Sequence, residues 1–109
     1  MEINISEQDN YSVVELGGDV DLSCSPEARK QILQVIEEGK NLLVHLGEVT
    51  YIDSSGIASL VEGYQTAKKQ QSDFALVSAS EAVMSVIKLA RLDKVFPMFD
   101  SVEAYSESN

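Results

Sequence analysis

The sequence predicts an α/β protein with a mostly parallel sheet of four to five strands, an N-terminal hairpin and about four helices. Near the start, two short segments alternate apolar with polar residues, which is typical of a hairpin. After them, short apolar runs alternate with longer segments in which apolar residues recur every three or four positions. Strands and helices that alternate in this way indicate a parallel sheet with right-handed crossovers.

The hairpin is predicted from two segments around a turn at residues 9–10. Ile3 and Ile5 alternate with polar residues, and residues 11–16 have the pattern of a second strand. The turn itself consists of Asp and Asn, which tolerate turn conformations and bond to their own backbone. We therefore expect the first two strands to pair with each other.

A helix is expected after the hairpin, with Ser25 as its N-cap and Pro26 at its first helical position. Gly39 is expected to end it, because glycine readily adopts the left-handed conformation found after helices. The buried face of this helix is predicted to hold Ala28, Ile32, Val35 and Ile36.

The middle of the chain predicts a strand, a helix and a second strand. The apolar run 42–46 is short and continuous, which favours a strand covered on both faces. A helix is predicted from about Ser54 to Gln70, followed by a strand at residues 74–77. The apolar stripe of this helix is Ile57, Leu60, Val61, Tyr64 and Ala67.

The C-terminal part predicts one more helix, a strand and a terminal helix. Residues 78–81 (SASE) fit a capping box for the third helix. Val95 and Phe96 are expected to begin the last strand, and Pro97 indicates that this strand lies at an edge of the sheet. The terminal helix is expected to start at Ser101.

Length and composition indicate one domain over residues 1–109. No apolar run approaches the roughly 20 residues that a membrane span requires, so we expect no direct membrane insertion. The first residues lack the basic and apolar regions of a signal peptide. The single cysteine, Cys24, suits a reducing compartment, and a cytoplasmic location is expected.

Charge and motifs exclude several functions. A net charge of −10 argues against nucleic-acid binding, and it fits either basic partner surfaces or solubility alone. Cys24 and His45 are the only soft ligands, so neither a metal nor another cofactor is expected. The chain lacks G-x-S-x-G, G-x-x-x-x-G-K-[ST] and G-x-G-x-x-G motifs, and we expect it not to be an enzyme.

The most informative feature is the turn at residues 53–56 (DSSG), where a strand pattern stops and a helical pattern starts. A helix N-terminus tolerates added negative charge, so a serine there can carry a phosphate and present it to a partner. Sites in parallel sheets form at the carboxyl ends of strands. The candidate partner-binding residues at two such ends are Asp19, Asp21, Asp53, Ser54, Ser55 and Gly56.

Two motifs together resemble the STAS domain family, in particular the free-standing bacterial anti-sigma factor antagonists. Residues 16–22 (LGGDVDL), followed by 25–29 (SPEAR), resemble the family's first strand end and the helix after it. Residues 49–57 (VTYIDSSGI) resemble its phosphorylation loop. A weaker match covers residues 92–97 (LDKVFP) and 100–101 (DS). The resemblance implies the STAS fold, which agrees with the order of elements predicted above.

The resemblance also implies a partner switch. Ser55 corresponds to the serine that accepts phosphate from a GHKL-type kinase, which is itself the anti-sigma factor. The phosphorylated protein is released from this kinase, and a PP2C-type phosphatase resets it. Asp21 corresponds to an acidic residue near the acceptor, and Ser54 is then expected to be the structural serine. From its residue type and place, Asp53 is expected to act as the N-cap of the helix.

Several alternatives stay open at this point. Asp21 either flanks a turn or orients the acceptor hydroxyl or a kinase-bound magnesium ion. The family also includes STAS subunits of phospholipid-transport ABC complexes, and regulators of biofilm or secretion that use the same switch without a sigma factor. The sequence departs from the family pattern at Cys24, His45 and Arg91, and His45 is expected to be a core or half-buried residue.

Overall fold

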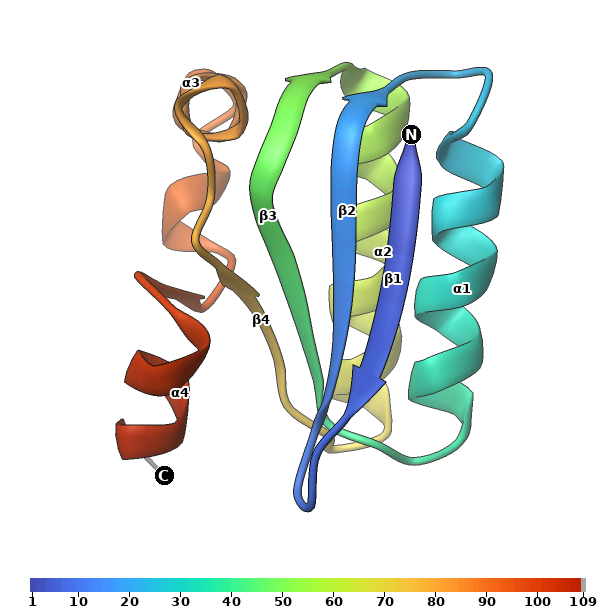
Figure 1. Ribbon diagram of the computed structural model, residues 1–109, viewed down its shortest axis with the longest axis vertical. Coiled ribbons are helices and arrows are strands. Elements are labelled where there is room, and N and C mark those ends of the chain that lie inside the picture. The colour runs from blue at the N-terminus through green and yellow to red at the C-terminus, as the bar shows by residue number, and fades with distance from the viewer. Residues whose placement is uncertain (109) are drawn as a thin grey trace.

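The computed structural model describes residues 1–108 and confirms the predicted order of elements (Figure 1). The strands are β1 (Glu2–Glu7), β2 (Ser12–Val20), β3 (Leu42–Ile52), β4 (Phe74–Val77) and β5 (Met98–Phe99). The helices are α1 (Ser25–Glu37), α2 (Ser54–Lys69), α3 (Glu81–Leu89), the short 3₁₀ helix η1 (Leu92–Lys94) and α4 (Val102–Ser108). In this part of the chain, no helix is long and apolar enough to cross a membrane.

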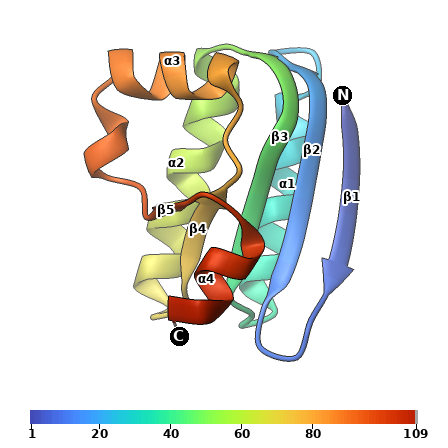
Figure 2. The same ribbon diagram turned by 60° about the vertical axis from the view of Figure 1, so that its left-hand side comes forward.

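The five strands form one sheet in the order β1-β2-β3-β4-β5. β1 pairs with β2 in antiparallel fashion, and the other neighbours are parallel. Helices α1 and α2 cover one face, while α4 lies on the opposite side of the sheet beside β4 and β5 (Figure 2). β1 forms an outer edge, and most of its side chains are exposed.

The core has two parts because β3 is covered on both faces, as its continuous apolar run predicts. Leu42 and Val44 pack into the larger cluster beneath α1 and α2, whereas Leu43 belongs to the smaller cluster beneath α4. His45 is half-buried, as expected, and its Nδ1 lies 3.6 Å from Oε2 of Glu15. The prediction that this strand is covered on both faces is thus confirmed.

Two helix caps differ from the prediction. Cys24 occupies the N-cap position of α1, so Ser25 is the first helical residue and Pro26 the second. Ser80, and not Ser78, caps α3: its hydroxyl oxygen accepts a bond from the N–H of Val83. In each case two candidate residues lie close together, and contacts outside the helix decide between them. Ser78 instead donates its hydroxyl to the carbonyl of Asp100.

The last strand starts later than predicted, at Met98 instead of Val95. The N–H groups of Val95 and Phe96 bond back to the carbonyl of Leu92, so these residues complete the turn of η1. Pro97 accepts a bond from the N–H of Leu76 but has no N–H of its own to continue the ladder. The predicted edge position of this strand is confirmed.

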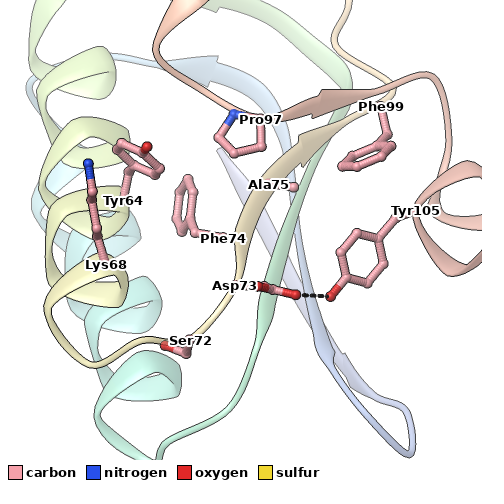
Figure 3. Close-up of a pocket in the computed structure, with 9 residues that line it drawn as sticks. All are labelled: Tyr64, Lys68, Ser72, Asp73, Phe74, Ala75, Pro97, Phe99 and Tyr105. Carbon is pink, nitrogen blue, oxygen red and sulfur yellow. Dashed lines mark hydrogen bonds between the residues drawn. The ribbon is translucent and has the colours of Figure 1, made fainter. Parts of the chain in front are cut away.

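Tyr105 of helix α4 packs against the sheet (Figure 3). Its hydroxyl donates to Oδ2 of Asp73 at 2.9 Å, and its ring packs edge-on against Phe99 and Tyr11. A pocket of about 330 Å³ opens beside it, between the end of α2, β4, β5 and α4. Burial, and then the bond to Asp73, raise the pKa of Tyr105 to about 12.

We predict that Tyr105→Phe lowers the free energy of unfolding by about 1.5 to 3 kcal/mol at neutral pH, the usual range for a bond to a charged group. The unfolded tyrosine ionises near pH 10, whereas the folded one keeps its proton until about pH 12. The unfolded state therefore binds fewer protons in this window, and the wild-type protein loses stability as the pH rises. The phenylalanine variant lacks this loss, so the difference between the two proteins should shrink between pH 10 and 12.

Urea unfolding of both proteins at several pH values measures this difference. Tyr51→Phe is the matched control, because Tyr51 is 51 % exposed and should show neither effect. A difference that stays constant from pH 8 to pH 12 would contradict the assignment of a buried, protonated Tyr105.

Candidate functional site

The candidate site forms where β2 and β3 end side by side. Val20 lies opposite Ile52 in the parallel ladder, and the N–H of Asp53 donates to the carbonyl of Val20 at 3.2 Å. The turns into α1 and α2 therefore leave the same end of the sheet, and both helices begin there (Figure 1). Residues from two distant segments are brought together by this pairing.

Gly56 allows α2 to start directly against these strand ends. A Cβ atom at this position would lie 2.7 Å from Cγ1 of Ile52 and 3.0 Å from Cγ1 of Val20. Both contacts are too close for a side chain, so only glycine fits without a shift of the core. The glycine of the DSSG turn thus has a packing role in this chain.

Asp53 caps α2, as the sequence predicts. Its Oδ1 accepts bonds from the N–H of Ser55 at 2.9 Å and from the N–H of Gly56 at 3.1 Å. The hydroxyl of Ser55 donates to the same oxygen at 2.5 Å. The hydroxyl bond above all, and the two backbone bonds, hold the pKa of Asp53 below its ordinary value.

Ser55 is half-buried and its hydroxyl takes part in two side-chain bonds. It donates to Asp53 and accepts a bond of 2.9 Å from the hydroxyl of Ser25. Ser54 is exposed, and its hydroxyl bonds to no other part of the described chain. The structural hydrogen bonds expected of Ser54 are therefore made by Ser55.

Asp21 and Asp19 lie at the end of β2 but bond to other groups. Oδ1 of Asp21 accepts bonds from both the N–H and the hydroxyl of Ser23, which lower its pKa. Desolvation, and then the charge of Asp53, oppose this lowering of the pKa. Asp19 accepts a bond from the Thr50 hydroxyl at 2.9 Å. These bonds support a turn role for Asp21, and its role toward magnesium stays a prediction.

Sequence reasoning missed three residues of this site. Ser25 was expected to cap α1, whereas its hydroxyl points to Ser55 and the residue is only 4 % exposed. Leu22 and Tyr51 are 72 % and 51 % exposed, and they lie directly beside Asp21 and in the strand before Asp53. The available signal was that Leu22 and Tyr51 are apolar residues near strand ends and belong to neither of the apolar stripes predicted for the two helices.

Cys24 is enclosed by its own turn. Its thiol lies 3.3 Å from the carbonyl of Asp19, to which it donates, and it accepts a bond from the N–H of Asp21. Within residues 1–108, no three His, Cys, Asp or Glu side chains form a group that could hold a metal ion. The site places a hydroxyl, that of Ser55, beside the carboxylate of Asp53.

Comparison with known proteins shows the family of this chain. The family model described as STAS domain matches residues 2–105. The chain is 24 % identical over 95 residues to the anti-sigma-B factor antagonist of Bacillus subtilis (strain 168), with 87 % of each chain covered. It is 26 % identical to the solved structure of an anti-sigma factor antagonist from Mycobacterium paratuberculosis, with a TM-score of 0.85 over 94 % of this chain and 87 % of that one.

The Bacillus cell fate determinant SpoIIAA, solved in its phosphorylated form, has the same fold. Its TM-score is 0.77 at 16 % identity, with 98 % of both chains covered. The predicted fold is thereby confirmed.

We predict that Asp53→Ala lowers the unfolding temperature, because the N–H groups of Ser55 and Gly56 lose their acceptor. Asp53→Asn keeps an acceptor oxygen but loses the charge, so it should lie between the alanine variant and wild type. The depressed pKa of Asp53 stabilises the fold above the ordinary pKa and ceases to do so as the pH falls through the folded value. The gap between wild type and Asp53→Asn should therefore narrow as the pH falls below the ordinary pKa of an aspartate.

Thermal unfolding followed by circular dichroism from pH 7 to pH 2 tests both statements. A gap between wild type and Asp53→Asn that does not narrow at all over this range would show that charge is not the source of the stabilisation.

Proposed function

The chain belongs to the STAS domain family, and we propose that it is an anti-sigma factor antagonist in a phosphorylation-controlled partner switch. In its unphosphorylated form it binds a GHKL-type serine kinase that is also an anti-sigma factor, and thereby frees the sigma factor. The kinase transfers phosphate from ATP to Ser55, and the complex dissociates. A PP2C-type phosphatase restores the binding form. Relatives named as anti-sigma-B factor antagonists support this proposal.

The observation that carries the proposal is the arrangement of Ser55. Ser55 is half-buried at the start of α2, and its hydroxyl already donates its proton to a carboxylate oxygen 2.5 Å away. The bonds to Asp53 and Ser25 therefore hold the oxygen in place. Ser54 is more exposed, but no side chain of the described chain orients its hydroxyl. The geometry favours Ser55 over Ser54 as the acceptor.

The surface around Ser55 suits a protein partner. Leu22 and Tyr51 expose apolar area beside the turn, and a partner can cover it. Asp19, Asp21 and Asp53 give the same region negative charge, which attracts a basic surface. The kinase is expected to present complementary apolar and cationic groups to this region.

Release follows from where the phosphate is placed. Phosphorylation adds about 1.5 to 2 negative charges at neutral pH. It also removes the Ser55 proton that Asp53 accepts, so a bond becomes a repulsion between two anions. The N–H groups of Ser55 and Gly56 already donate to Asp53, which leaves the phosphate to face outward. A loss of a few kcal/mol weakens a complex by two or more powers of ten.

In this proposal the chain is the substrate of a kinase and not itself an enzyme, it binds no nucleic acid, and it works in the cytoplasm. The alternatives within the family are a transporter subunit and a switch without a sigma factor. A constitutive subunit would stay bound to its partner whether or not Ser55 carries a phosphate. Binding of the phosphorylated protein therefore separates the transporter alternative from a switch.

We predict that incubation with the partner kinase and ATP adds one phosphate, on Ser55. Ser55→Ala should abolish the modification and leave the protein bound to the kinase. Ser54→Ala is the matched control and should still be phosphorylated. Mass spectrometry of proteolytic peptides locates the phosphate, and a phosphate on Ser54 would contradict the assignment.

We further predict that Ser55→Asp weakens kinase binding at least about tenfold, the effect of about 1.4 kcal/mol. The charge acts at the surface, so the circular dichroism spectrum should not change and the unfolding midpoint should move by only a few degrees. Calorimetric titration beside a thermal melt measures both. Kinase-phosphorylated wild-type protein serves as the reference for the mimic. If that protein binds as tightly as the unmodified one, the switch does not exist.

A further inference from the structure

The hydroxyl of Ser25 has no role in capping its own helix. The N-cap of α1 is Cys24, and Ser25 is the first helical residue, with its N–H bonded to the carbonyl of Asp21. Its hydroxyl points away from α1 and donates to Oγ of Ser55 at 2.9 Å. Ser25 is only 4 % exposed, and its bond to the half-buried Ser55 is partly buried. The Ser25 hydroxyl therefore acts on Ser55, the residue of another segment to which it donates.

The bonds of Ser55 leave one direction open at its oxygen. A serine hydroxyl has one hydrogen and two lone pairs. The hydrogen goes to Asp53, and one lone pair accepts the hydrogen of Ser25. These two bonds determine the rotamer of Ser55, and the second lone pair has no partner in the described part of the chain.

We propose that Ser25 is a positioning residue that aims the free lone pair of Ser55 at an incoming phosphoryl group. This inference rests on the proposed function. In the transfer, Oγ of Ser55 bonds to the γ-phosphorus of ATP, the bond from that phosphorus to the β,γ-bridging oxygen breaks, and ADP leaves. The hydroxyl proton passes to Asp53, which already accepts it, and then to water. Such transfers depend mostly on positioning, because the transition state needs little help from a strong base.

The position of Ser25 also indicates which step it affects. Before transfer its hydroxyl donates to the Ser55 hydroxyl oxygen, and afterwards the same oxygen is an ester oxygen that still accepts a bond. The bond is kept in both states, so it contributes little to the equilibrium between them. What it changes is how often Ser55 holds the rotamer that the transfer needs. The residue is buried behind Ser55 and is not on the surface that meets the kinase. Its loss should therefore slow the transfer and leave the binding of the kinase unchanged.

The test compares Ser25→Ala with Ser59→Ala in the kinase reaction. Ser59 is a second buried hydroxyl, 6 % exposed, which donates to the backbone carbonyls of Ser55 and Ser25 but does not touch Oγ of Ser55. Ser25→Ala should reduce kcat about three- to tenfold, the effect of one lost hydrogen bond, with KM for this protein unchanged. Ser59→Ala should leave kcat within about twofold of wild type, and Ser25→Thr, which keeps the hydroxyl, should restore it.

An NMR measurement without the kinase tests the same hydrogen bond between Ser25 and Ser55. The three-bond Hα–Hβ couplings of Ser55 report its rotamer, which should be single in wild type and Ser59→Ala and averaged in Ser25→Ala. Unchanged couplings in a folded Ser25→Ala protein, or an unchanged kcat, would overturn the role of Ser25. If wild type is not phosphorylated on Ser55 at all, the proposed function fails, and the positioning role in transfer is overturned with it. If wild type is phosphorylated and Ser25→Ala is equally fast, only the role of Ser25 fails.

Discussion

The site depends on one constraint, the parallel pairing of β2 with β3 up to their last residues. Because Val20 lies opposite Ile52, the turns into α1 and α2 start side by side. Ser25 and Ser55 are separated by 30 residues in the chain, yet their hydroxyls form a hydrogen bond. Gly56 completes the arrangement, since any larger residue would push α2 away from the strand ends. A shift of this register would separate the two serines and leave the acceptor without its second bond.

Most of the fold could be predicted from the sequence because periodicity and turn residues act locally. The order of strands and helices, the cap at Asp53 and the edge position of the last strand all follow from short patterns. The caps of α1 and α3 could not be predicted, since the contacts of Ser78 with Asp100 and of Ser80 with Val49 come from distant segments. The contact between Ser25 and Ser55 could not be predicted either, because it also joins distant segments. Nothing in the sequence links the serine at the start of one helix to the serine at the start of the other.

Asp53 joins the stability of α2 to the chemical state of Ser55. One oxygen atom receives two backbone N–H groups and the serine hydroxyl, so the helix start and the acceptor share a single anion. The N–H groups at a helix N-terminus can bind a phosphate, but here those of Ser55 and Gly56 already bind the carboxylate of Asp53. Phosphorylation of Ser55 should therefore change the surface that a partner contacts more than it changes the packing of the core. This arrangement suits a signal that changes binding and leaves the fold in place.

The shape of the sheet also limits how copies of this chain can meet. On one side, β5 is two residues long and follows Pro97, so it offers almost no open backbone to a further strand. On the other side, β1 has an open edge along Glu2–Glu7. Two copies of β1 in antiparallel register would place Glu2 of one against Glu7 of the other, and like charges there oppose the pairing. Edge-to-edge aggregation, a common hazard of small open sheets, is disfavoured at both ends by proline and by charge.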